Sequence, residues 1–452
     1  MTLAAVPAEQ VEQLVLLLIV SLVVVLIARQ LRFPYTLALV LVGLLMGVLP
    51  FIPTVQFNPE VVLFVFIPAL LFEGAWNISV TVLLKNWLAV LLLAVPGLLI
   101  SLLVVAVALH FGAGLTWLEA LLLGAIISPT DPVAVVALFR QLRMGERMRT
   151  IIEGESLFND GVGAAVYTVV LGLLLVAVGH TTNAADPVQV SLSTVWLFLG
   201  GPLIGLVLGF LIARLLRHFD DHLIEMTITF SAAYGIYLLG DLLHTSGLLA
   251  VVVAGLILGS FGRQRGMSER SRAVVDEVWE FIGYIANSLL FLLLGMQIGS
   301  SHIGPTLAPL LWAIAGVIVG RALMIFLLFT LHDAIARWYA HYRRDQRKSL
   351  RSSLLPVPRS WRPIILLSGL RGALSLALVL SLPHDLPNIG LFEFVTYGVV
   401  LVTLVGQGIA MRAILPGWSA RHEPIEMALE MPTMSQSPDA PDAPDAPEES
   451  PG

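Results

Sequence analysis

The sequence predicts an all-α polytopic membrane protein with about 13 transmembrane helices. Hydrophobic residues make up 57% of the 452 residues, charged residues only 12%, and the mean hydropathy is +0.90. An average soluble domain carries roughly 25% charged residues, so this chain lacks the polar groups that a water-facing surface needs. Its apolar runs are also much longer than the roughly 10-residue strands of a membrane barrel. These observations exclude a soluble enzyme, a nucleic-acid-binding protein and a disordered scaffold.

Thirteen apolar runs approach the length of about 20 residues that a membrane-spanning helix needs. The third, eighth and ninth are the shortest. The predicted spans are 11–28, 35–52, 61–78, 86–109, 116–139, 150–179, 190–213, 223–243, 246–262, 278–299, 306–334, 361–383 and 391–415. Residues 420–452 have a different composition, with an acidic repeat of Pro, Asp and Ala that is typical of a disordered tail. The transmembrane domain is therefore expected to cover residues 1–419.

The basic residues predict the orientation of the chain. With thirteen spans, 23 of the 25 Lys and Arg residues fall in alternate loops, and the other loops have none. Under the positive-inside rule the basic loops are cytoplasmic. We therefore expect a multi-pass protein of the cell (inner) membrane with its N-terminus outside and its C-terminus, including the tail, in the cytoplasm. The two remaining cations, Arg321 and Arg371, fall inside the eleventh and twelfth spans.

Several kinds of chemistry are excluded by what the sequence lacks. There are no cysteines, which excludes disulfides, thiolate metal sites and thiol catalysis. There is no Gly-rich phosphate loop and no metal-ligand cluster, so no cofactor is expected. The net charge of −6 argues against a nucleic-acid partner. Uphill transport would have to be driven by an ion gradient.

The fifth span contains a predicted break. Ser128-Pro129-Thr130-Asp131-Pro132 places two prolines three residues apart, and each removes a backbone donor and clashes with the preceding turn. Broken helices are tolerated in a membrane where they line a cavity, and the freed carbonyls then bind ions. A simple proline kink is the alternative. The acid between the prolines favours the broken helix, because ionisable groups in a bilayer usually mark function.

A second polar segment lies at the start of the sixth span. At a spacing of four residues on a helix, Glu155 stacks under Asn159 and Ser156 under Asp160. Carboxylate, hydroxyl and amide oxygens suit a hard monovalent cation. A capped helix start is the alternative, because acids are preferred in the first turn. It accounts for Glu153 but not for Asp160. Two further acids, Glu73 and Asp241, also fall within predicted spans.

The two polar segments are expected at the same depth. Asp131 lies nine residues before Arg140, and Asp160 lies eleven residues after Arg149. At about 1.5 Å per residue, both carboxylates would be roughly 14–17 Å into the membrane, near its midplane. Two such acids titrate as a coupled pair. A group that holds a proton or a cation, but not both, couples their movements.

The two membrane arginines also need partners. Arginine stays protonated, so each requires an anion or a polar cavity. Glu155 can pair with either Arg321 or Arg371, and the sequence leaves that choice open. The ion pairing could also be purely structural, without contact to a transported ion.

Four segments resemble those of a known family. GAIISPTDPVAVVALF, EGESLFNDGVGAAVYTVV, LLSGLRGALSLALVLSLP and NPEVVLFVFIPALLFEGAWN are similar to the signature segments of the cation:proton antiporter-1 (monovalent cation:proton antiporter) family, which includes bacterial sodium/proton antiporters. The resemblance covers roughly residues 10–415 in order. It implies a homodimer of thirteen-helix protomers, each with interleaved core and dimerisation helices. The core would be an inverted repeat with crossed, unwound helices.

The resemblance also implies a site. The Na⁺ site would comprise Asp131 and Asp160, with Ser156 and the backbone of Thr130 adding oxygens. Asn159 and Thr130 would steady the unwound region. The support pair would be formed by Glu155 with Arg321 or Arg371.

The expected function is exchange of Na⁺ (or Li⁺ or K⁺) for H⁺ by alternating access, serving pH homeostasis, and the protein is not expected to be an enzyme. Electroneutral one-for-one exchange is expected, because Asn159 occupies the place where electrogenic relatives carry a second acid. A passive cation channel is one alternative. Another is an intramembrane aspartyl protease using Asp131 and Asp160. It leaves the broken helix and the arginines unexplained, and F-N-D-G stands in place of the G-x-G-D of such proteases.

Overall fold

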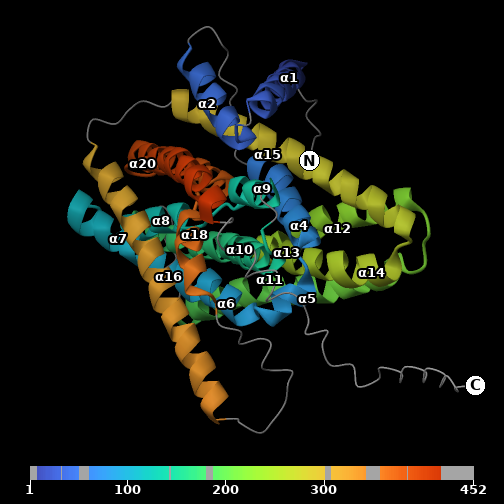
Figure 1. The fold of residues 1–452 in the computed structure, drawn as a ribbon. Helices are drawn as coiled ribbons and strands as arrows, with labels where there is room; N and C mark the ends of the chain where they lie inside the picture. Colours follow the sequence, from blue (N-terminus) through green and yellow to red (C-terminus); the bar gives the residue numbers. More distant parts are fainter. Residues whose placement is uncertain are drawn as a thin grey trace, which may run out of the picture.

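In the part of the chain that the computed structural model describes, all regular secondary structure is helical (Figure 1). That part comprises residues 8–31, 33–49, 61–141, 144–179, 187–300, 307–342, 357–383 and 385–418, and it contains no β-strand. Within it, nine helical segments are long and apolar enough to cross a membrane, and three shorter apolar helices accompany them. The predicted fold class is confirmed.

The helices of the first half run from α1 to α10. They are α1 (Ala8–Gln30), α2 (Tyr35–Val48), the π-helix η1 (Val62–Phe66) continuing into α4 (Ile67–Asn77), α5 (Val80–Lys85), α6 (Trp87–Leu92) continuing through the π-helix η2 (Leu93–Gly97) into α7 (Leu98–Ala113), α8 (Trp117–Ile127), α9 (Val133–Gln141) and α10 (Glu146–Ala177).

The helices of the second half run from α11 to α20. They are α11 (Pro187–Leu216), α12 (His222–Leu242), α13 (Gly247–Ile257) continuing through η3 (Leu258–Gly262) into α14 (Arg263–Gly266), α15 (Glu269–Ser300), α16 (Ala308–Tyr342), η4 (Arg359–Trp361), α18 (Arg362–Leu367), α19 (Ala373–Leu380), and α20 (Ile389–Val402) with η5 (Thr403–Gln407). The last of these helices continues to Trp418.

All thirteen predicted ranges overlap helical segments, although the number of membrane crossings stays a prediction. The main difference is in helix length. Helix α15 begins at Glu269 rather than at residue 278, and α16 extends to Tyr342 rather than ending at residue 334. Hydropathy detects only the apolar part of a helix, whereas backbone hydrogen bonding continues through its charged ends. The predicted tail, residues 420–452, lies outside the described residues.

Two helices are interrupted at their centres, and the interruptions touch. Helix α8 ends at Ile127 and α9 begins at Val133, while α18 ends at Leu367 and α19 begins at Ala373. The backbone N–H of Asp131 donates to the carbonyl of Leu370 over 2.8 Å. Each interruption therefore satisfies part of the other's backbone, as a membrane interior requires.

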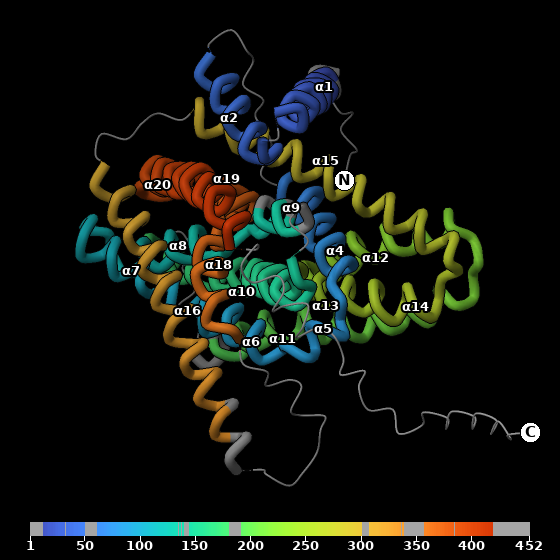
Figure 2. The backbone as a smooth tube through the Cα atoms, in the orientation of Figure 1, coloured from blue at the N-terminus to red at the C-terminus, as the bar shows by residue number. Residues whose placement is uncertain are grey.

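The helices form two groups, and α10 lies at the boundary between them (Figure 2). One group, here called the core bundle, consists of α7, α8, α10, α16, α19 and α20 with their attached segments. The other, the flanking bundle, consists of α1, α2, α4, α11, α12, α13 and α15 with theirs. Helix α10 contacts α8 and η2 of the core bundle, and α4, α11 and α13 of the flanking bundle. The functional residues on α10 consequently lie between the bundles.

Candidate functional site

Asp131 lies at the crossing of the interrupted helices. Its Oδ1 accepts a hydrogen bond from the backbone N–H of Val133 over 3.0 Å. The backbone of Ala373 also hydrogen-bonds to this carboxylate. Val133 and Ala373 are the first residues of α9 and α19. The carboxylate thus caps two helix N-termini, whose partial positive charges favour an anion at this place.

Two glycines in the segment Ser368–Gly372 allow this close approach. A Cβ at Gly372 would overlap Oδ2 of Asp131. A Cβ at Gly369 would lie 2.8 Å from Nε of Arg321. Any other residue at these positions would displace one of the two charged groups.

A hydrogen-bond network joins α10 to residues 128–132, the unwound segment between α8 and α9. The hydroxyls of Thr130 and Ser156 lie 3.1 Å apart. Asn159 donates to Oγ1 of Thr130 over 2.8 Å, and its carbonyl accepts from the backbone N–H of Thr130 over 3.3 Å. All three side chains are buried. The network holds the unwound segment against α10.

The structure pairs Glu155 with Arg321. Arg321 donates through Nη1 to Oε1 of Glu155 and through Nη2 to Oε2 over 3.0 Å, and Nη2 also donates to the carbonyl of Ile365. Arg371 instead donates to the carbonyl of Pro129 over 3.3 Å. Glu155 and Arg371 are completely buried, and Arg321 is nearly so. The choice that the sequence left open is therefore resolved in favour of Arg321.

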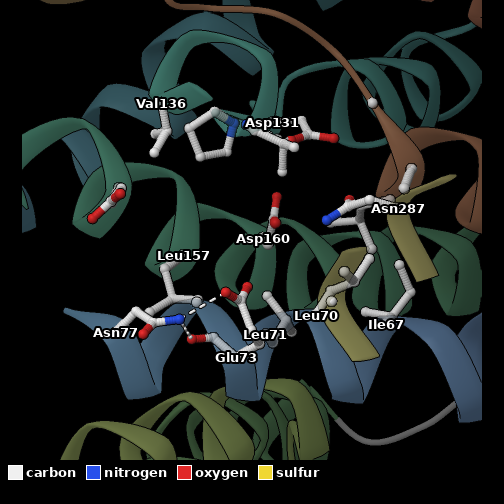
Figure 3. Close-up of a pocket in the computed structure, with 18 of the residues that line it drawn as sticks. Ile67, Leu70, Leu71, Glu73, Asn77, Asp131, Val136, Leu157, Asp160 and Asn287 are labelled. Atoms are coloured by element: carbon white, nitrogen blue, oxygen red, sulfur yellow. Dashed lines mark hydrogen bonds between the residues drawn. The ribbon is translucent and has the colours of Figure 1, made fainter. Parts of the chain in front are cut away.

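A cavity of about 330 Å³ opens between the two bundles, and both Asp131 and Asp160 line it (Figure 3). The Asp160 side chain points into the cavity and makes no hydrogen bond or ion pair with the described residues. It differs in this from the three charged groups near it, Asp131, Glu155 and Arg371, each of which is bonded to the protein.

Not all of the residues predicted for the site reach the cavity. Thr130, Asp131 and Asp160 line it, whereas Ser156 and Asn159 do not. These last two lie behind Thr130 and contact it. The Ser156 hydroxyl contacts that of Thr130 in this structure, and a direct contribution of its oxygen to the cation stays a prediction.

The opposite wall of the cavity was not predicted as part of the site. It includes Glu73 and Asn77 of α4, and Asn77 donates to Oε1 of Glu73 over 2.7 Å. It also includes Asn287 of α15. A carboxylate with an amide four residues later in an apolar span was a usable sign for Glu73. No sequence pattern says which face of which helix opposes Asp160.

A second cavity of about 800 Å³ lies one helical turn from the first. Along α10, Asp160 lines the first cavity and Ala164 lines the second. Along α19, Ser375 lines the first cavity and Leu378 lines the second. A third pair, Ile67 and Leu63, repeats this spacing along the helix formed by η1 and α4. The barrier between the cavities is thus about one turn, roughly 5.4 Å, thick on three elements.

Comparison with known proteins gives consistent results. Residues 15–416 match the model of the family described as "Sodium/hydrogen exchanger, transmembrane". The chain is 38% identical over 411 residues to the Na⁺/H⁺ antiporter ApNhaP of Aphanothece halophytica. The aligned residues make up 90% of this chain and 74% of the relative. It is 33% identical over 416 residues to the Na⁺/H⁺ antiporter NhaH of Halobacillus aidingensis, with 89% of this chain and 96% of the relative covered.

A solved structure supports the same fold. The sodium/proton antiporter MjNhaP1 of Methanocaldococcus jannaschii superimposes with a TM-score of 0.70 at 21% identity, covering 91% of this chain and 98% of that one. The resemblance noted in the sequence is confirmed, and it is a resemblance to transporters rather than to enzymes. This chain belongs to the transmembrane sodium/hydrogen exchanger family.

Proposed function

We propose that this protein exchanges Na⁺ for H⁺ by alternating access, and that Asp160 is the carboxylate that binds either ion. One observation carries the proposal: Asp160 faces the cavity without a hydrogen bond or ion pair among the described residues, whereas Asp131 caps two helices and Glu155 is paired with Arg321. A carboxylate that is free to bind either a proton or a cation couples the two fluxes. No covalent chemistry and no cofactor is needed.

The cation is held by oxygens at the crossing. Asp160 supplies the charge, and Thr130 and Asp131 line the same cavity. Ser156 and Asn159 act through Thr130, which they hold in place. Carboxylate, carbonyl and hydroxyl oxygens suit hard cations, so Li⁺ and K⁺ are further candidates.

The two cavities support alternating access. The smaller cavity includes Arg29 and Glu153, which are close in sequence to the basic loops, so we assign it to the cytoplasmic side. The larger cavity then faces outward, the N-terminus is outside and the C-terminus cytoplasmic. A shift of the core bundle by about one turn would transfer Asp160 from one cavity to the other. A passive channel would instead need a continuous path.

We propose one-for-one, electroneutral exchange. Asn159 is neutral, and Asp131 is occupied in capping α9 and α19, which leaves Asp160 as the single exchanging group. The same capping role argues against a protease in which Asp131 and Asp160 share a water molecule. We further propose a homodimer in the cell inner membrane that contributes to pH homeostasis. Only 28% of the apolar stretch of α1 is buried within the protomer, which leaves a face for lipid or a partner.

Reconstitution tests this function. In proteoliposomes, an imposed Na⁺ gradient should drive proton movement in the opposite direction, with no change when the membrane potential is clamped to zero. Asp160→Asn keeps the shape of the side chain but removes its titration and charge. It should abolish coupled movement while the protein still inserts in the membrane. Substantial exchange by Asp160→Asn would overturn the assignment.

A further inference from the structure

The wall opposite Asp160 presents one face of α15 to the cavity. Its lining residues are Glu280, Gly283, Tyr284 and Asn287, at spacings of three, one and three residues. These spacings place them on a single helical face. Asn287 is the last of them along α15. In Figure 3 its amide points toward Asp160, with the amide nitrogen at the near end.

The side-chain carbonyl oxygen of Asn287 lacks a hydrogen-bond donor. Its side chain is 94% buried, yet its carbonyl oxygen has no hydrogen-bond partner among the described residues. Buried polar atoms without partners are rare, because desolvation is then uncompensated. Asn77, in the same cavity, differs: its amide donates to the backbone carbonyl and to Oε1 of Glu73. Asn287 thus leaves an unpaired oxygen in the wall of the cavity on α15, as Ser375 does on α19.

We infer that Asn287 is a cation-binding residue: once its amide rotates, its oxygen is a neutral ligand from the flanking bundle for the monovalent cation held at Asp160. The inference rests on the proposed function. An amide oxygen is a hard ligand that replaces part of the ion's hydration shell. Because it carries no charge, it adds a ligand without adding a second titrating group.

The position of Asn287 also gives it a role in selectivity. Asp160 belongs to the core bundle and Asn287 to the flanking bundle, so both side chains line one cavity only when the bundles are arranged as in this structure. The distance between the side chains of Asp160 and Asn287 then decides which ion can contact both. Asn287 thus helps to set cation choice on the side to which this cavity opens.

The test compares Asn287→Ala with Ser288→Ala. Ser288 is the next residue of α15, is also buried and has an unpaired hydroxyl, but it does not line the cavity. Two readouts are measured on the full-length protein: the rise in unfolding temperature with increasing NaCl, LiCl or KCl, and cation-driven proton movement in proteoliposomes. Asn287→Ala should weaken the apparent Na⁺ affinity in both readouts roughly ten- to a hundredfold. It should also change the order of preference among the three cations, whereas Ser288→Ala should do neither.

A second variant keeps the test decisive if Asn287→Ala fails to fold. Asn287→Ser retains a shorter hydroxyl oxygen and should lower Na⁺ affinity by less while also altering selectivity. Suppose that the wild type exchanges Na⁺ for H⁺, but every Asn287 variant that folds keeps the wild-type cation affinity and preference. The role of Asn287 is then refuted and the proposed function stands. If the wild type shows no coupled exchange, both fall together.

Discussion

The α-carbon of Gly372 lies directly against the carboxylate of Asp131, at the point where the two interrupted helices cross. The contact leaves no room for a side chain at position 372. It also lets one carboxylate cap both α9 and α19. The crossing is therefore sensitive to a single methyl group.

Gly372→Ala should consequently impair both stability and transport. A Cβ would overlap Oδ2 of Asp131, and overpacking of this kind costs about 1–3 kcal/mol. Unfolding temperature in detergent and exchange in proteoliposomes measure the effect. Gly390→Ala is the matched control, because a Cβ there meets nothing within 4 Å. Equal unfolding temperatures and exchange rates for the two variants would contradict the claim that position 372 has no room for a side chain.

Removing either partner of the Glu155–Arg321 pair should be strongly destabilising. The pair is buried, so its loss leaves an uncompensated charge that costs on the order of 3–5 kcal/mol. A double-mutant cycle with Glu155→Gln and Arg321→Met, followed by thermal unfolding, measures the coupling. The double variant should be more stable than the sum of the single effects predicts. Strict additivity would show that the two side chains do not act as a pair.

The two cavities should be reachable from opposite sides of the membrane. The chain has no cysteine, so single cysteines can be introduced without background. Ile67→Cys lines the first cavity and Leu63→Cys the second, one turn apart on the helix formed by η1 and α4, which belongs to the flanking bundle and takes no part in the proposed shift. A membrane-impermeant thiol reagent should modify the first only from the cytoplasmic side and the second only from outside, with the unmodified chain as control. Labelling of both from one side would rule out separate cavities.

The sequence predicts part of this site, for identifiable physical reasons. Pro129 and Pro132 predict the interruption between α8 and α9, because each proline lacks a backbone hydrogen-bond donor. Residue counts from the basic loop forecast a common depth for Asp131 and Asp160, since helices have a fixed rise. The interruption between α18 and α19 has no proline, and glycines alone are tolerated in membrane helices, so only the family resemblance indicated it.

Other features of the site depend on helix packing. Arg321 and Arg371 are both mid-span cations, and nothing in their local sequence says which one meets Glu155, 166 residues from Arg321. The opposing wall with Glu73 and Asn287 likewise follows from how α4 and α15 pack against the core bundle. The direction of the Ser156 hydroxyl, toward Thr130 rather than into the cavity, also requires the three-dimensional structure.

The central claim is that Na⁺ and H⁺ compete for the Asp160 carboxylate, and it is tested most directly by measuring the apparent Na⁺ affinity as a function of pH. Exchange is measured in proteoliposomes at equal pH on both sides and at several Na⁺ concentrations. Protonation of Asp160 excludes the cation, so low pH should inhibit, and high pH should limit the return of protons. The profile should be a bell whose limbs report macroscopic pKa values.

On the acid limb, the apparent Na⁺ affinity should strengthen about tenfold per pH unit, as expected where one proton competes with one cation. Raising the Na⁺ concentration should accordingly shift that limb to lower pH. An acid limb that keeps its position while Na⁺ varies widely would mean that the proton and the cation occupy separate groups, and would contradict the shared carboxylate.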